Sequence, residues 1–144
     1  MSVAIRHIGL VVSDLHKALE FWCGVLNFKV VTRMNESGQS LDSMMGLINV
    51  NVTTVKLNAP DGGMLELLRF HSHPDADEWC GVPFSTGLTH IALTVKDIDA
   101  VVESMRDFGC EISNHPQVSP DGKVKVIYAQ GPERVLLELV EMIG

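Results

Sequence analysis

The sequence predicts an α+β protein made of two tandem βαβββ modules. Two observations lead to this prediction. The segment around His7 recurs around His90, at a constant spacing of 83 residues, with His, Ile, Leu, Val and Asp in matching places. Each half also ends in an apolar run with Leu-Glu-Leu at its centre, around Glu66 and Glu138. With 144 residues, 46% of them apolar, the chain suits one compact domain or two small fused modules.

The first module starts with an apolar, β-branched stretch, residues 5–12, that is typical of a strand. Asp14 can then cap a helix that extends to about Leu26, and Asn27 suits the left-handed residue that ends it. The polar, glycine-containing stretch 35–46 is predicted to be a loop. The other expected elements are strands at 28–34, 48–57 and 64–70, with a turn at 60–63.

The second module repeats this order. A strand is expected at 88–95, and Asp97 can cap a helix that runs to about Phe108 and stops at Gly109. The other expected elements are strands at 110–113, 123–129 and 134–142, with turns at 120–122 and 130–132. We therefore predict modules at 1–70 and 88–144, joined by the proline-containing linker 71–87, within one domain overall.

His7, Glu66, His90 and Glu138 occupy equivalent places in the two modules. Each glutamate has leucines on both sides, which places those leucines on the opposite face of its strand. A carboxylate on a largely apolar strand needs a partner that stabilises its charge, and a divalent cation is one. The four residues therefore predict one metal site with two imidazole and two carboxylate ligands. The alternative is that the glutamates face solvent and the histidines are hydrogen-bonded in the core.

These ligand types suit Zn, Ni, Co, Mn or Fe(II), and the absence of thiolates disfavours a structural zinc site. The three cysteines form no CxxC pair, and no signal peptide is recognised, so a reducing cytoplasm is expected. A formal net charge of −7 argues against nucleic-acid binding. No apolar run approaches the length of a membrane span, about 20 residues.

Several segments together carry a family resemblance. They are His-Ile-Gly-Leu-Val-Val-Ser-Asp-Leu from residue 7, Ala-Leu-Glu-Phe-Trp from 18, Gly-Val-Leu-Asn-Phe from 24, His-Ile-Ala-Leu-Thr-Val-Lys-Asp-Ile from 90 and Leu-Leu-Glu-Leu-Val-Glu from 136. On these segments the chain resembles the vicinal oxygen chelate superfamily, which includes glyoxalase I, methylmalonyl-CoA epimerase, fosfomycin-resistance enzymes, extradiol dioxygenases and bleomycin-resistance proteins. The resemblance covers nearly the whole chain and implies a curved, cup-like mixed sheet.

The resemblance implies that metal ligands occupy the first and last strands of each module, here His7, Glu66, His90 and Glu138. It further implies a homodimer and a small substrate that presents two vicinal oxygens. Four intact ligand positions favour the glyoxalase, epimerase and fosfomycin-resistance branches.

The chemistry implied is metal-assisted proton abstraction next to a carbonyl, with Glu138 as first candidate base and Glu66 as second. We expect a glyoxalase I-like lyase or isomerase. An acyl-CoA epimerase resembling methylmalonyl-CoA epimerase is the alternative within this class. A non-catalytic small-molecule-binding or resistance protein is the alternative outside it.

Further residues have two interpretations each. The pair in His71-Ser72-His73 is either a metal-binding motif or part of a solvated linker, with the linker favoured. Phe21 and Trp22 are expected in the core rather than in a pocket. The segment Met44-Met45-Gly46 could line a substrate channel, since Met adapts to irregular surfaces. Three basic side chains either steer an anionic substrate or simply solvate strands, with solvation favoured: Arg33, Lys56 and Arg69.

Overall fold

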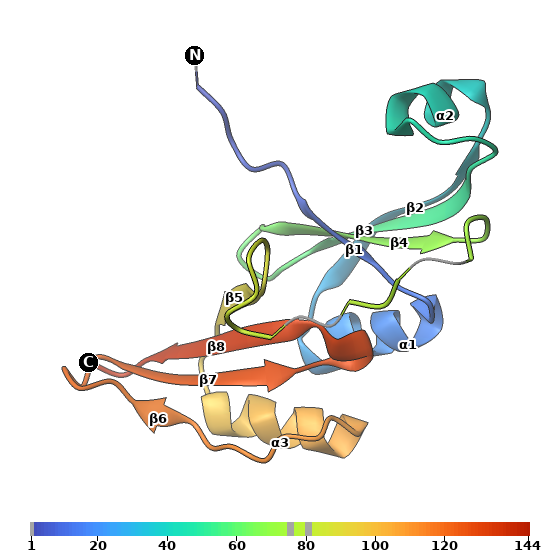
Figure 1. Ribbon diagram of the computed structural model, residues 1–144. Coiled ribbons are helices and arrows are strands. Elements are labelled where there is room, and N and C mark those ends of the chain that lie inside the picture. Colours follow the sequence, from blue (N-terminus) through green and yellow to red (C-terminus); the bar gives the residue numbers. More distant parts are fainter. Residues whose placement is uncertain (1, 75–76, 80–81) are drawn as a thin grey trace. The chain divides into compact units, whose positions relative to one another are not determined.

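The computed structural model describes residues 2–74, 77–79 and 82–144. The chain divides into two compact units, Met1–Asp77 and Glu78–Gly144. Each holds its own four-stranded mixed sheet (Figure 1), which confirms the α+β class and the duplicated βαβββ order. Residues 75–76 and 80–81 of the expected linker lie outside the described residues. No helix in the described part of the chain is long and apolar enough to cross a membrane.

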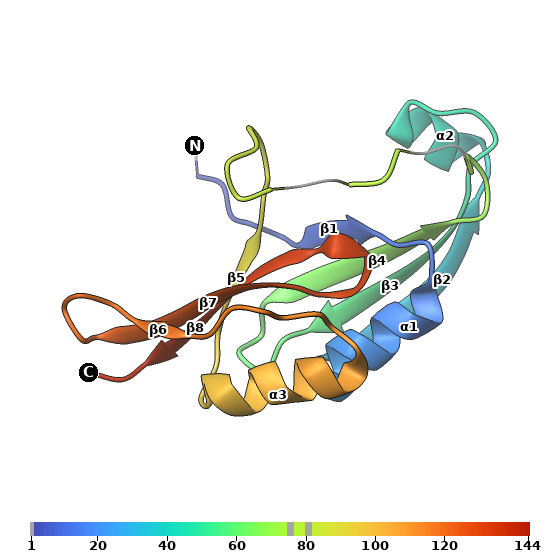
Figure 2. The same ribbon diagram turned by 60° about the horizontal axis from the view of Figure 1, so that its bottom comes forward.

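The first unit has the strand order β1-β4-β3-β2, with β1 parallel to β4 and the other neighbours antiparallel. Its elements are β1 (Ile8–Val11), α1 (Leu15–Leu19), β2 (Lys29–Ser37), α2 (Gln39–Met45), β3 (Asn51–Asn58) and β4 (Met64–Phe70). Figure 2 shows α1 along one face of this sheet and α2 near the end of β2.

The predicted first helix begins as expected but changes its geometry. The Asp14 carboxylate accepts a hydrogen bond from the Lys17 amide and caps α1. From Glu20 to Val25 the chain forms a π-helical turn rather than continuing as an α-helix. Phe21 and Trp22 lie in this turn at 0% and 2% exposure, so both belong to the core, as predicted.

The loop predicted at 35–46 is wrong. Strand β2 continues to Ser37 because this segment pairs with β3, and the helix α2 follows. Gly38 and the left-handed Gly46 bound this helix, whose residue Leu41 is buried. Leu41 and Met45 pack with the strand residues Val50, Val52, Leu68 and Phe70.

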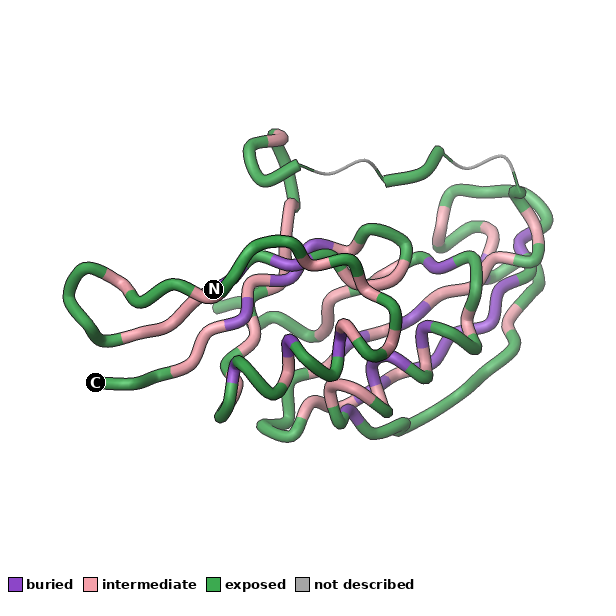
Figure 3. Tube along the Cα trace, turned by 90° about the horizontal axis from the view of Figure 1, so that it is seen from below, coloured by how far each residue is buried: buried purple, intermediate pink, exposed green. Residues whose placement is uncertain are grey.

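The second unit repeats the topology, with strand order β5-β8-β7-β6 and β5 parallel to β8. Its elements are β5 (Ile91–Thr94), α3 (Ile98–Phe108), β6 (Gln117–Val118), β7 (Val124–Gln130) and β8 (Leu136–Met142), with a 3-10 turn at Pro132–Arg134. Asp97 caps α3 and the left-handed Gly109 ends it, as predicted. Buried and exposed stretches alternate along the strands and helices of both units (Figure 3).

The short strand predicted at 110–113 is also wrong. The Cys110 amide bonds back to the Met105 carbonyl as part of the helix end. The Arg106 guanidinium then donates hydrogen bonds to the backbone carbonyls of Ile112 and Asn114. These backbone groups are therefore occupied by the end of α3, and the third strand forms later, as β6.

Candidate metal-ligand pairs

In the first unit, β4 alternates between two faces. Leu65 and Leu67 are 4% and 0% exposed on the face that packs into the core, and Glu66 points the other way. Gly9 on β1 lies directly beside Glu66, so His7, two residues earlier, projects to the same face. The fold thus brings together the predicted histidine and glutamate of this module.

The His7 Nε2 atom lies 3.6 Å from Glu66 Oε1, and the side chains are 28% and 15% exposed. This separation exceeds a normal hydrogen bond, about 2.7–3.2 Å. Two ligands bound about 2.1 Å from a tetrahedral ion would be about 3.4 Å apart, so the spacing fits two donors to a shared cation. The other His7 nitrogen, Nδ1, is buried with no hydrogen-bond partner in the described structure. Neither ring nitrogen of His7 therefore has a hydrogen-bond partner at normal distance in the described structure.

In the second unit, β8 repeats the alternation. Leu137 and Leu139 are fully buried, Glu138 faces the other way, and Ala92 on β5 lies beside Glu138 just as Gly9 lies beside Glu66. The His90 Nδ1 atom is 2.8 Å from the Thr89 hydroxyl. Such a second partner orients a histidine ring and fixes which nitrogen is available to a ligand.

Tyr128 lies beside both predicted ligands of the second unit, and the sequence analysis did not single it out. It stands directly across from Glu138 on β7, and its hydroxyl oxygen is 3.5 Å from His90 Nε2. The two rings meet edge to face, with centroids 5.0 Å apart. Hydrogen bonding to the Glu138 carboxylate, with some desolvation, raises the pKa of Tyr128 above its usual value. Tyr128 occupies the same place in the second module as Lys56 in the first, across from the equivalent glutamate of its own sheet. A comparison of the two modules could have identified it.

Each unit thus contributes one histidine and one glutamate with compatible donor chemistry. Within residues 2–74, 77–79 and 82–144, no group of three or more His, Cys, Asp or Glu side chains gathers to hold a metal ion. Of the histidines in the segment 71–73, His71 is hydrogen-bonded to Thr53 and His73 to Ser72. The assignment of the four residues to one metal ion stays a prediction.

Comparison with known proteins identifies the family. A relative from Actinomyces sp., named 2-epi-5-epi-valiolone epimerase, is 25% identical over 98% of this chain and 80% of its own. A probable lactoylglutathione lyase from Synechocystis sp. is 23% identical over 95% of this chain and 94% of its own. A crystal structure of a glyoxalase family protein from Bacillus cereus matches with a TM-score of 0.91 and 26% identity, over 100% of this chain and 97% of that one.

The family model described as Glyoxalase/Bleomycin resistance protein/Dioxygenase superfamily matches residues 4–139, which cover most of both modules and include all four predicted ligands. This chain belongs to the Glyoxalase/Bleomycin resistance protein/Dioxygenase superfamily.

Proposed function

We propose that this protein is a divalent-metal-dependent lyase or isomerase that abstracts a proton next to a carbonyl of a small substrate, in the manner of glyoxalase I. The observation that carries the proposal is the recurrence of one His–Glu arrangement at the same register of two duplicated sheets. A histidine two residues before the strand partner of a glutamate would not be expected by chance at both equivalent places.

His7, Glu66, His90 and Glu138 are the proposed ligands, and Zn, Ni, Co, Mn and Fe(II) all suit this donor set. The proposal requires the two pairs to meet at one ion, either within a chain or across a homodimer. When bound, the ion would supply Lewis-acid polarisation of the substrate carbonyl, which acidifies the neighbouring carbon. A substrate with two vicinal oxygens would use both of them to reach this centre.

Glu138 is the first candidate for the base and Glu66 the second. A base must come within about 3 Å of the proton-bearing carbon, so the carboxylate has to be free on one side. Tyr128 supports this role for Glu138, because it stands directly across from it on β7, where a hydroxyl donor can orient the carboxylate. Nothing equivalent to a phenol stands across from Glu66, where the cross-strand residue is Lys56.

The relative named 2-epi-5-epi-valiolone epimerase supports epimerisation as the second candidate reaction. For this chain we propose an acyl-CoA substrate, as in methylmalonyl-CoA epimerase. Inversion at a carbon next to a carbonyl also begins with loss of a proton, so both candidates use the same groups of this chain. They differ in the substrate and in the position to which the proton returns.

The test is Glu138→Gln, with metal content and proton exchange measured separately. Solvent deuterium incorporation into 2-oxo thiohemiacetals or 2-methyl acyl-CoA esters reports proton abstraction and distinguishes the two candidates. With excess metal supplied, we expect the variant to stay loaded, although it binds the ion more weakly, and to lose exchange by a factor of at least about 100. Full exchange in the variant would remove Glu138 from the role of base. A wild-type protein that holds metal but exchanges neither substrate class would favour the non-catalytic binding protein.

A further inference from the structure

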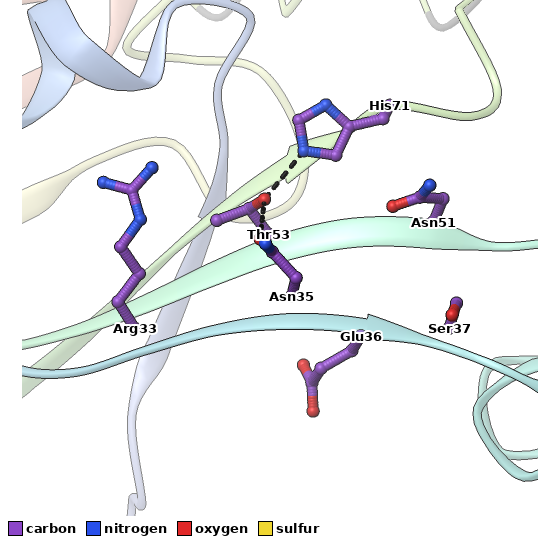
Figure 4. Close-up of a pocket in the computed structure, with 7 residues that line it drawn as sticks. All are labelled: Arg33, Asn35, Glu36, Ser37, Asn51, Thr53 and His71. Atoms are coloured by element: carbon purple, nitrogen blue, oxygen red, sulfur yellow. Dashed lines mark hydrogen bonds between the residues drawn. The ribbon is translucent and has the colours of Figure 1, made fainter.

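The first unit carries a second polar site, on the sheet face opposite Glu66. It is a pocket of about 490 Å³ (Figure 4), lined by Arg33, Asn35, Glu36, Ser37, Asn51, Thr53 and His71. The strand register places Asn35 and Thr53 on one face, and Glu66 with its neighbour Lys56 on the other. The pocket is therefore separate from the proposed metal ligands and does not depend on them.

Thr53 organises the pocket. Its side chain is almost fully buried, and its hydroxyl donates to Asn35 Oδ1 at 2.6 Å. A hydroxyl has one hydrogen, so the same oxygen accepts from His71 Nε2, which lies 2.7 Å away. This chain of hydrogen bonds holds the His71 ring over the pocket. It also uses the Asn35 carbonyl oxygen, and leaves the Asn35 Nδ2 donors without a partner in the described structure.

Arg33 supplies the charge. Its side chain rises on the same side of the sheet as His71, at the other end of the pocket (Figure 4). Within the described residues it takes part in no ion pair. Glu36 is the one acidic member of the lining, and it points to the other side of the sheet, where its Oε2 accepts from the Thr54 hydroxyl at 3.0 Å. The face of the pocket on which Arg33 lies thus has a guanidinium and the Asn35 amide as donors, and the Glu36 carboxylate is turned away from it.

We propose that this pocket binds a small molecule through an anionic group, a carboxylate or a phosphate, held between the Arg33 guanidinium and the Asn35 amide. A guanidinium presents paired donors that match both groups, and the adjoining amide adds a neutral donor. The fixed His71 ring closes the other end. A local donor-rich surface of this kind can bind an anion although the whole chain carries a net charge of −7.

The test is a titration of the ¹⁵N-labelled full chain with inorganic phosphate, and separately with acetate, at constant ionic strength. We expect saturable shifts of backbone amides at residues 33–37, 51–53 and 71. Arg33→Gln should raise the dissociation constant about tenfold or more, because charge-assisted hydrogen bonds are lost. Lys29→Gln is the matched control: it removes the same charge from an exposed position on the same strand, and should change binding by less than about twofold.

Saturation by phosphate alone, by acetate alone or by both supports the site and identifies the anionic group that it accepts. The proposal is overturned if neither anion saturates below about 50 mM. It is also overturned if Arg33→Gln and Lys29→Gln weaken binding equally, since that would show only a general effect of charge. Shifts confined to His7 and Glu66 would assign the anion to the other face and would overturn it as well.

Discussion

Glu66 presents a carboxylate that its own unit stabilises poorly. The side chain is 15% exposed, and the His7 Nε2 atom, the ion-pair partner that the described structure gives it, lies beyond hydrogen-bond distance at 3.6 Å. Glu66→Gln removes the charge and keeps the shape. Without metal, we expect the variant to be as stable as the wild type or more stable by up to about 1 kcal/mol, because a shielded, unpaired carboxylate is unfavourable.

With metal bound, the wild type should become more stable than Glu66→Gln. An ion that binds only the folded state stabilises it by about 2.7 kcal/mol at 100 times its dissociation constant. For a chain of 144 residues that unfolds in one step, the unfolding entropy is about 0.3 kcal/mol per degree, so the wild-type melting temperature should rise by about 9 °C. Loss of one of four ligands should reduce this rise in Glu66→Gln to less than half.

The assay is thermal unfolding with excess chelator and with added Mn²⁺ or Zn²⁺. Glu20→Gln is the matched control, because Glu20 also pairs with a histidine, His16, at 2.8 Å, but is 54% exposed. The melting temperature of Glu20→Gln should stay close to that of the wild type with chelator and with added metal. The reasoning is refuted if Glu66→Gln destabilises the metal-free protein by more than about 2 kcal/mol, or if wild type and variant gain equally from metal.

Three further predictions concern packing, the α2 segment and titration. Leu67→Ala removes a fully buried side chain and should cost about 2–5 kcal/mol in urea unfolding, whereas a loss below about 1 kcal/mol would contradict its place in the core. Asp42→Ala removes two acceptors from the amides of Asn49 and Val50, at 3.0 and 2.9 Å, so these amides should exchange with solvent about tenfold faster; unchanged exchange would contradict the contact. Tyr128 is the only tyrosine, so phenolate absorbance reports it alone, and its midpoint should lie above about pH 10 and fall in Glu138→Gln. Because the folded pKa is raised, the associated stability holds below about pH 10 and is lost as pH rises through the folded value; an unchanged midpoint in the variant would contradict the contact.

The duplicated sheets could be predicted because local patterns determine them. Leucines on both sides of Glu66 and Glu138 indicate the alternation, and the structure confirms that those leucines are buried. The caps Asp14 and Asp97 act on amides three residues away, so they too can be read from the chain alone.

The elements that could not be predicted depend on distant contacts. The end of β2 looks polar along the chain, and only its pairing with β3 makes it a strand. The segment after Gly109 has the residue pattern of a strand, but its backbone carbonyls accept hydrogen bonds from the Arg106 side chain instead of from another strand. Tyr128 and the polar pocket were missed for the same reason, since cross-strand neighbours such as Thr53 and Asn35 are 18 residues apart.

The most direct test of the central claim is the metal content of the purified, chelator-free protein. Four protein ligands per site predict one divalent ion per chain, whether the ligands meet within a chain or across a dimer. Replacement of His7 or His90 by Ala should then reduce the content together with the affinity, by a factor of at least about 10. A wild-type chain, with His7 and Glu66 both present, that holds far less than one ion would contradict the claim.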